Sequence, residues 1–193
     1  GDRVNFSLEH NDEENIGIIQ NILERNNYRV RKSVNLSKQS HILASNIDLL
    51  VMVITIKDPI TTTSFIDRFL VNAEAYSIET LLVFNKYDIY DKEEQNKIDN
   101  LVEIYSNIGY KCLLTSTINN FNISKLKEEV TKKTIMFGGH SGVGKTSLIN
   151  AIDSSLELKV GDISSQHLQG KHTTTYAELF DLDSNTKLID TPG

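Results

Sequence analysis

TIMFGGHSGVGKTSLIN, residues Thr134 to Asn150, is the part of the sequence from which the fold class follows. It opens with an apolar run typical of a buried strand and closes with a run that favours a helix. The middle, GHSGVGKT, matches G-x-x-x-x-G-K-[ST] in the strand, loop and helix setting that a phosphate-binding loop requires. Its glycines allow several backbone N–H groups to point at phosphates, at the positive end of the following helix. The stretch therefore predicts nucleotide binding.

Two side chains of this loop carry the chemistry. Lys145 can reach the β- and γ-phosphates of a nucleotide, and the Thr146 hydroxyl can ligate Mg²⁺. The residues expected to contact the nucleotide here are consecutive: Gly139, His140, Ser141, Gly142, Val143, Gly144, Lys145, Thr146 and Ser147.

Strands alternate with helices on the N-terminal side of the loop. The run DLLVMVITI (Asp48 to Ile56) is continuous, apolar and β-branched, as in strands that are buried on both faces of a parallel sheet. Repeated βα units imply right-handed crossovers and a doubly wound α/β sheet. The expected strands are 48–56, 80–84, 111–115 and 134–138, and the expected helices are 62–76, 92–107 and 123–131.

The composition narrows the class of protein. The chain has 193 residues, of which 39% are hydrophobic and 24% charged, as in ordinary globular proteins. Its one cysteine, Cys112, excludes an internal disulfide and a zinc site built from cysteines of this chain. The sequence holds no apolar run of the roughly 20 residues that cross a bilayer. With a net charge of −6, diffuse attraction to nucleic acid is not expected. A cytoplasmic protein with no membrane partner is predicted.

Residues 1–45 have a different sequence pattern, in which short β-type runs are separated by polar turns. We expect them to be the C-terminal part of a small β-barrel whose first strands precede Gly1, and residues 46–193 to form the α/β domain. Between Arg25 and Lys38 the chain has five basic residues and no acidic one. Two interpretations stay open for this run: contacts to phosphates, or a solvated strand face. The candidate contacts are Arg25, Arg29, Arg31 and Lys32.

NKYD, Asn85 to Asp88, follows the apolar strand TLLVF and favours guanine over adenine. The Asp88 carboxylate can accept both the N1–H and the exocyclic amine of guanine, a pair of donors that adenine lacks. Asn85 can tie the loop to its neighbours, and the stem of Lys86 can lie over the base. After the next strand, the Thr115-Ser116-Thr117 turn can offer a backbone N–H to the guanine carbonyl, so Ser116 and Thr117 join the predicted site.

Two further motifs suit hydrolysis. The chain ends in DTPG after an apolar strand, which places Asp190 near a Mg²⁺ shell and the Gly193 N–H near a γ-phosphate. Before it, HTTT (172–175) offers a threonine that could complete the Mg²⁺ shell only when the γ-phosphate is present, as in a switch. The sequence does not say which of the three threonines does this, and an exposed strand start is the alternative interpretation of HTTT.

The motifs stand in an unusual order: NKYD, TST, GHSGVGKT, HTTT, DTPG. In most small GTPases the phosphate loop comes first, so this order is circularly permuted. The chain resembles the ribosome small-subunit-dependent GTPase A (RsgA or YjeQ) family. The resemblance covers nearly its whole length, through GDRV, NILERNNYRVRK, ASNIDLLVMV, IDRFLVNAEA, NKYD, GHSGVGKTSLIN, GKHTTT and DTPG.

The resemblance implies an N-terminal OB-fold, a permuted GTPase domain and a C-terminal zinc-binding domain that lies outside this chain, with Zn²⁺ expected only there. It implies GTP hydrolysis with Mg²⁺, stimulated by the small ribosomal subunit, in late maturation of that subunit and in contact with its rRNA. By motif, Asn85 and Asp88 would read guanine, and Thr174 would be the switch threonine. Lys145, Thr174 and His172 would serve catalysis, with His172 helping to orient the attacking water. A monomer is expected.

Alternative functions stay open from the sequence. The chain could be a permuted GTPase with a different RNA partner, or a nucleotide-gated RNA-binding module whose hydrolysis is incidental. Asn85 and Asp88 disfavour an ATP-using enzyme. Because the chain ends at Gly193, soon after the first residues of the second switch, this piece alone could be inactive.

Overall fold

A six-stranded sheet forms the centre of the molecule. The computed structural model describes residues 1–10, 15–32, 40–153, 178–182 and 185–190. The strands lie in the order β7-β6-β5-β8-β10-β9, and every neighbouring pair is parallel except β9 and β10. Their bounds are β5 (Leu49–Ile54), β6 (Thr80–Phe84), β7 (Lys111–Leu114), β8 (Thr134–Gly138), β9 (Glu178–Asp181) and β10 (Lys187–Asp190).

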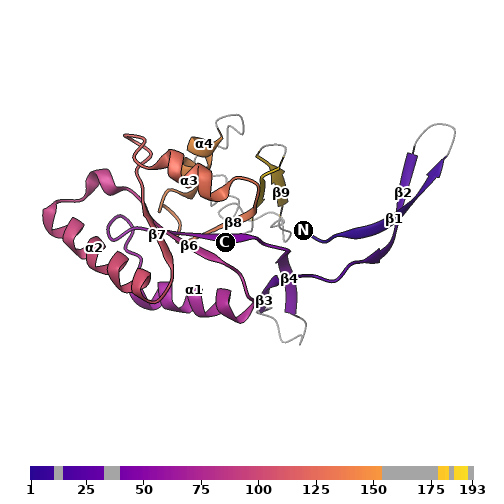
Figure 1. Ribbon diagram of the computed structural model, residues 1–193, viewed down its shortest axis with the longest axis horizontal. Helices are drawn as coiled ribbons and strands as arrows, with labels where there is room; N and C mark the ends of the chain where they lie inside the picture. Colours follow the sequence, from indigo (N-terminus) through magenta and orange to yellow (C-terminus); the bar gives the residue numbers. More distant parts are fainter. Residues whose placement is uncertain (11–14, 33–39, 154–177, 183–184, 191–193) are drawn as a thin grey trace, which may run out of the picture.

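Helices cover both faces of the sheet (Figure 1). One face carries α1 (Thr63–Ala75) and α2 (Lys92–Asn107), and the other carries α3 (Ile123–Val130) and α4 (Lys145–Ile152). A short 3₁₀ turn, η1 (Tyr87–Ile89), follows β6. The predicted doubly wound α/β fold is therefore confirmed.

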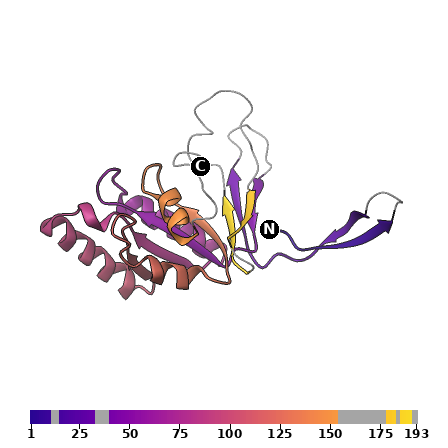
Figure 2. The same ribbon diagram turned by 90° about the horizontal axis from the view of Figure 1, so that it is seen from above.

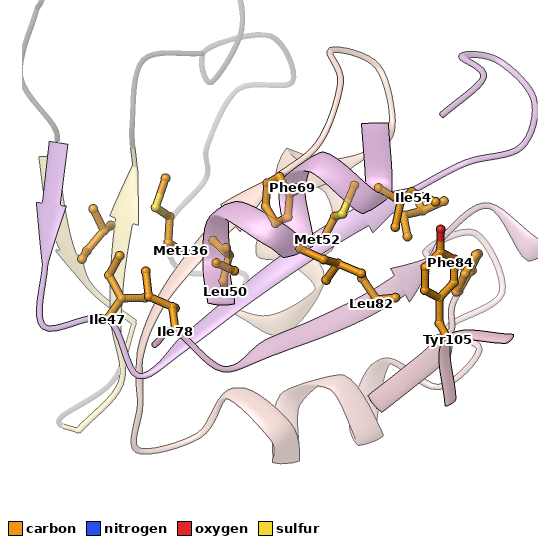
Figure 3. Close-up of a cluster of buried hydrophobic side chains, with 14 of the residues drawn as sticks. Ile47, Leu50, Met52, Ile54, Phe69, Ile78, Leu82, Phe84, Tyr105 and Met136 are labelled. Atoms are coloured by element: carbon orange, nitrogen blue, oxygen red, sulfur yellow. The ribbon is translucent and has the colours of Figure 1, made fainter. Parts of the chain in front are cut away.

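The alternation of side chains along β5 explains why this strand is apolar throughout. Leu50, Met52 and Ile54 pack under α1 and α2, in the cluster drawn in Figure 3. Leu49, Val51 and Val53 belong to the cluster under α3 and α4. Because successive strand residues point to opposite faces, a central strand with helices on both sides has no solvated face.

Capping residues set the starts of the helices on the first face. The Thr62 hydroxyl accepts a hydrogen bond from the Phe65 N–H at the start of α1. Asp91 and Glu94 form a reciprocal capping box at the start of α2. Such boxes satisfy backbone donors that the first helical turn leaves unpaired. The predicted range 92–107 matches α2 at both ends, whereas the predicted strand 48–56 is longer than β5 by one residue at its start and two at its end.

The N-terminal strands form two small antiparallel sheets outside the main one. β1 (Val4–His10) pairs with β2 (Asn15–Ile22), and β3 (Tyr28–Lys32) pairs with β4 (Ser40–Ser45). Within the described residues the two pairs are not joined to each other, and the β1–β2 hairpin extends away from the α/β part (Figures 1 and 2). Its apolar side chains, including Phe6, Leu8 and Ile19, are exposed. The assignment of residues 1–45 to an OB-fold stays a prediction.

None of the described helices has the length and apolar character needed to cross a membrane.

Removing a buried side chain from an inner strand of the sheet should destabilise the fold strongly. Leu82 in β6 is fully buried, so Leu82→Ala is expected to lower the free energy of unfolding by about 2–5 kcal/mol. Ile104→Ala serves as the control, because Ile104 is 56% exposed on α2 and its change is expected to cost much less. Urea unfolding followed by circular dichroism measures both. Equal losses would contradict the placement of β6 inside the sheet, between β7 and β5.

Candidate nucleotide-binding site

Three of the predicted motifs meet at one edge of the sheet. NKYD follows β6, Thr115-Ser116-Thr117 follows β7, and the phosphate loop follows β8. These strands are parallel through β5, so their carboxyl ends lie at the same edge. That edge is where open α/β sheets bind ligands.

The backbone of the phosphate loop needs its glycines. Gly139, Gly142 and Gly144 all have positive φ angles, of 133°, 83° and 96°. A Cβ on Gly139 would lie 2.4 Å from the Val53 carbonyl oxygen, and one on Gly144 would lie 2.5 Å from Asn85 Nδ2. Only glycine fits these two positions, because both the φ angle and the space exclude a side chain.

Lys145 and Thr146 begin α4 directly after this loop. The Lys145 ammonium group donates to the carbonyl oxygens of Gly139 and His140, at 2.9 and 2.8 Å, so it lies across the mouth of the loop. Thr146 is 9% exposed in the first turn of the helix. A cation and a helix N-terminus thus converge on one loop, which is the arrangement that binds phosphates.

Asn85 connects the motif loops to one another. Its Nδ2 donates to the Val143 carbonyl oxygen of the phosphate loop at 2.9 Å, and its Oδ1 accepts from the Thr115 hydroxyl at 3.1 Å. Asn85 is 2% exposed. Asn85 is therefore a buried residue that holds the phosphate loop and the turn after β7 next to the NKYD loop.

Asp88 is the exposed carboxylate of NKYD, within η1. One of its oxygens accepts a hydrogen bond from the Ser116 hydroxyl. The Tyr87 ring next to it stacks on Phe121, with centroids 5.6 Å apart and planes 21° apart. Both contacts fix the orientation of η1 against the turn after β7, so the structure brings Asp88, Ser116 and Thr117 into one neighbourhood.

Lys86 turns the chain out of β6. It has a left-handed backbone with a φ of 63°, and its ammonium group donates to the carbonyl oxygen of Asp58, in the loop after β5. Pro59 of that loop faces Gly142 of the phosphate loop. The loop between β5 and α1 is therefore part of the same edge, although no motif in the sequence identified it.

An aromatic contact supports the phosphate loop from the α1 side. The Phe65 ring lies 4.0 Å from the His140 imidazole, centroid to centroid. A Cβ on Gly138 would lie 2.4 Å from Phe69 Cζ, so that ring packs directly on the end of β8. Phe65 and Phe69 lie four residues apart on α1, and the folded chain shows that their neighbour is the phosphate loop.

Two of the four basic candidates are engaged within the protein. Arg25 forms an ion pair with Asp2, and this hydrogen-bonded partner lowers the pKa of Asp2 to about 2. The Arg29 guanidinium lies over the Phe69 ring at 5.0 Å, and its burial lowers its pKa. Arg25 is thus in a partly exposed ion pair and Arg29 packs on an aromatic ring, while their contacts with RNA stay predictions. Arg31 and Lys32 lie in β3, and their side chains fall outside the description.

The predicted hydrolysis residues are only partly described. His172, Thr173, Thr174, Thr175 and Gly193 lie outside the described residues. Asp190 ends β10, which pairs with β8 through Ile189 and Met136, so its backbone reaches the edge where the phosphate loop begins. Among the residues that the structure describes, no cluster of three or more histidine, cysteine or acidic side chains could hold a metal ion.

Fold and site together define a nucleotide-binding protein of the phosphate-loop class in which the NKYD and Thr115-Ser116-Thr117 loops precede the phosphate loop. The RsgA GTPase family model matches residues 22–193, and the chain belongs to this family.

Relatives and solved structures agree with this assignment. The chain is 54% identical, over all of its 193 residues and 61% of the relative, to the small ribosomal subunit biogenesis GTPase RsgA of Christiangramia forsetii. It is 53% identical to the protein of the same name from Flavobacterium johnsoniae, over 59% of that protein. Among solved structures, YjeQ from Thermotoga maritima superposes with a TM-score of 0.76 at 37% identity, covering the whole chain and 60% of that structure. YloQ, described as a circularly permuted GTPase, gives 0.69 at 29% identity, covering the whole chain and 56% of that structure.

The chain thus spans about 60% of the length of these curated relatives.

Gly144→Ala should disturb the connection between the phosphate loop and Asn85. At a positive φ, alanine is expected to cost about 1 kcal/mol of stability, and here its Cβ would also collide with Asn85 Nδ2. Gly109→Ala is the matched control, since Gly109 has a φ of 100° but no atom within 4 Å of its Cβ position. Urea unfolding should show the larger loss for Gly144→Ala. The same loss in both variants would mean that the contact with Asn85 contributes nothing to stability.

Proposed function

We propose that this chain binds GTP and GDP and, within the full-length protein, hydrolyses GTP during biogenesis of the small ribosomal subunit. One observation supports the nucleotide part: the Asn85 side chain joins the NKYD loop to the phosphate loop, so the residues that would read the base lie next to those that would bind phosphate. The ribosomal part is supported by the relatives, each named a small ribosomal subunit biogenesis GTPase.

Guanine selectivity rests on Asp88. Its exposed carboxylate would accept the N1–H and the 2-amino group of the base, while the Ser116 hydroxyl holds one of its oxygens. The turn after β7 would offer the Thr117 N–H to the guanine carbonyl, since the Ser116 N–H donates to the Phe121 carbonyl oxygen at 3.2 Å. The stem of Lys86 would cover one face of the base. The Ser116 hydroxyl contact favours this arrangement because it fixes the direction of the carboxylate before the base arrives.

Phosphate binding and hydrolysis would depend on positioning and charge. The N–H groups of residues 139–147 would surround the β-phosphate, and Lys145 would shift from loop carbonyls to phosphate oxygens. The residues present fit Mg²⁺, since a threonine hydroxyl at Thr146 and a carboxylate at Asp190 are the oxygen donors that this ion prefers. When bound, Mg²⁺ would neutralise charge that develops on the phosphates. We assign the Thr174 hydroxyl to the Mg²⁺ shell that forms only when the γ-phosphate is present. His172 would help to orient the attacking water, and the Gly193 N–H would donate to the γ-phosphate.

Turnover by the full-length protein tests the whole proposal. GTP hydrolysis is expected to rise by about 10²-fold or more with purified small ribosomal subunits, the range that one positioned catalytic group supplies. Lys145→Ala should abolish it. Unstimulated turnover would exclude the ribosomal partner and favour another RNA. Subunit binding that is equal with GTP, with GDP and without nucleotide would favour a plain RNA-binding module.

Asp88→Asn tests base reading separately. Replacing the carboxylate by an amide is expected to weaken GDP binding by about 100-fold, because two hydrogen bonds to a charged acceptor are lost. The same change should improve binding of xanthosine diphosphate, whose 2-oxo group can accept from the new amide. Asp99→Asn, on the exposed surface of α2, makes the same charge change away from the site. Fluorescent-nucleotide competition measures both, and unchanged GDP affinity in Asp88→Asn would exclude Asp88 as the base-reading residue.

A further inference from the structure

The hydrogen-bond ladder between β5 and β6 is interrupted where the two strands leave the sheet. At the start of the ladder, the Leu50 N–H donates to the Glu79 carbonyl oxygen at 2.8 Å, and the rungs of a parallel pair repeat every two residues. The repeat would continue with a bond from the Ile56 N–H to the Asn85 carbonyl oxygen. The Tyr90 hydroxyl occupies that place instead: it accepts from the Ile56 N–H at 3.3 Å and donates to the Asn85 carbonyl oxygen at 3.0 Å.

The Tyr90 side chain is held firmly in this position. It is 5% exposed, and its ring packs in the cluster under α1 and α2. The Tyr90 carbonyl oxygen accepts a hydrogen bond from Gln95 Nε2 at 3.0 Å, which fixes its backbone to α2. Burial raises the pKa of Tyr90 to about 12, so the hydroxyl remains a proton donor at neutral pH.

We propose that Tyr90 is a positioning residue for guanine recognition: its hydroxyl replaces one rung of the β5–β6 ladder and holds the two strand ends apart. This inference rests on the proposed binding of guanine nucleotides. It assigns a role to a residue that makes no contact with the base and lies outside the NKYD motif.

The inserted hydroxyl sets the direction of two loops. On the β6 side it fixes the Asn85 carbonyl, directly before Lys86 adopts its left-handed backbone and Asp88 follows in η1. On the β5 side it fixes the Ile56 N–H, directly before the loop whose Asp58 carbonyl accepts from Lys86. With a direct rung in its place, both loops would start closer together and Asp88 would shift relative to Ser116.

Tyr90→Phe removes the hydroxyl and keeps the ring. Without it, the Asn85 carbonyl and the Ile56 N–H would close into a direct rung, which moves the start of η1 and with it Asp88. We expect GDP affinity of the full-length protein to fall about tenfold, because a displaced Asp88 would lose the equivalent of one charged hydrogen bond to the base. Tyr105→Phe is the matched control, because Tyr105 is also buried and its hydroxyl donates to Asp67 at 2.9 Å, between α2 and α1.

The decisive measurement is the ratio of GDP to inosine diphosphate affinity in the wild type and both variants. Inosine lacks the 2-amino group, so the ratio reports how well Asp88 is placed against the base. Tyr90→Phe should reduce this ratio several-fold, while Tyr105→Phe should leave it unchanged even where it lowers the unfolding temperature. If Tyr90→Phe lowers both affinities equally, or neither, the positioning role is overturned. If the wild type itself fails to prefer GDP over inosine diphosphate and ADP, the proposed guanine site fails instead.

Discussion

The site depends on one buried hydrogen bond, from Asn85 to the Val143 carbonyl oxygen, between residues 58 positions apart in the chain. It requires a carbonyl of the phosphate loop to face the end of β6, and that in turn requires glycine at position 144. Because Asn85 is buried and also accepts from Thr115, its loss would leave polar atoms of two other loops without a partner. The Asn85 side chain thereby connects the loops that follow β6, β7 and β8.

Local signals in the sequence were sufficient for β5 to β8, for the helices and for the phosphate loop, whereas β9 was not predicted. The capping box at Asp91 and Glu94 marks the start of α2, and the apolar run of β5 predicts its central place because both faces are buried. The contacts of Tyr90 could not be predicted in this way. Its hydroxyl meets the end of β5, and no pattern around Tyr90 indicates that the neighbouring ladder lacks a rung.

The basic residues near the N-terminus have contacts within the protein that a charge pattern does not reveal. The guanidinium of Arg29, whose contact with RNA stays a prediction, lies over Phe69, and the Phe69 ring packs on Gly138 at the entrance to the phosphate loop. Tyr28 similarly lies against Tyr76 at the end of α1. The β3–β4 pair is therefore attached to the α/β part through aromatic contacts at α1, and its first residues face the protein.

The place of β5 in the sheet also has a consequence for synthesis on the ribosome. β5 is the first strand of the sheet to be translated, yet it lies between β6 and β8, so the sheet can grow outward from its middle. The translated order completes β6 and β7 before the phosphate loop exists, and domains begin to fold while the chain emerges. The part of the nascent chain that carries the NKYD and Thr115-Ser116-Thr117 loops is therefore complete first. Its Asn85 amide acquires its Val143 partner only when the second half has been made.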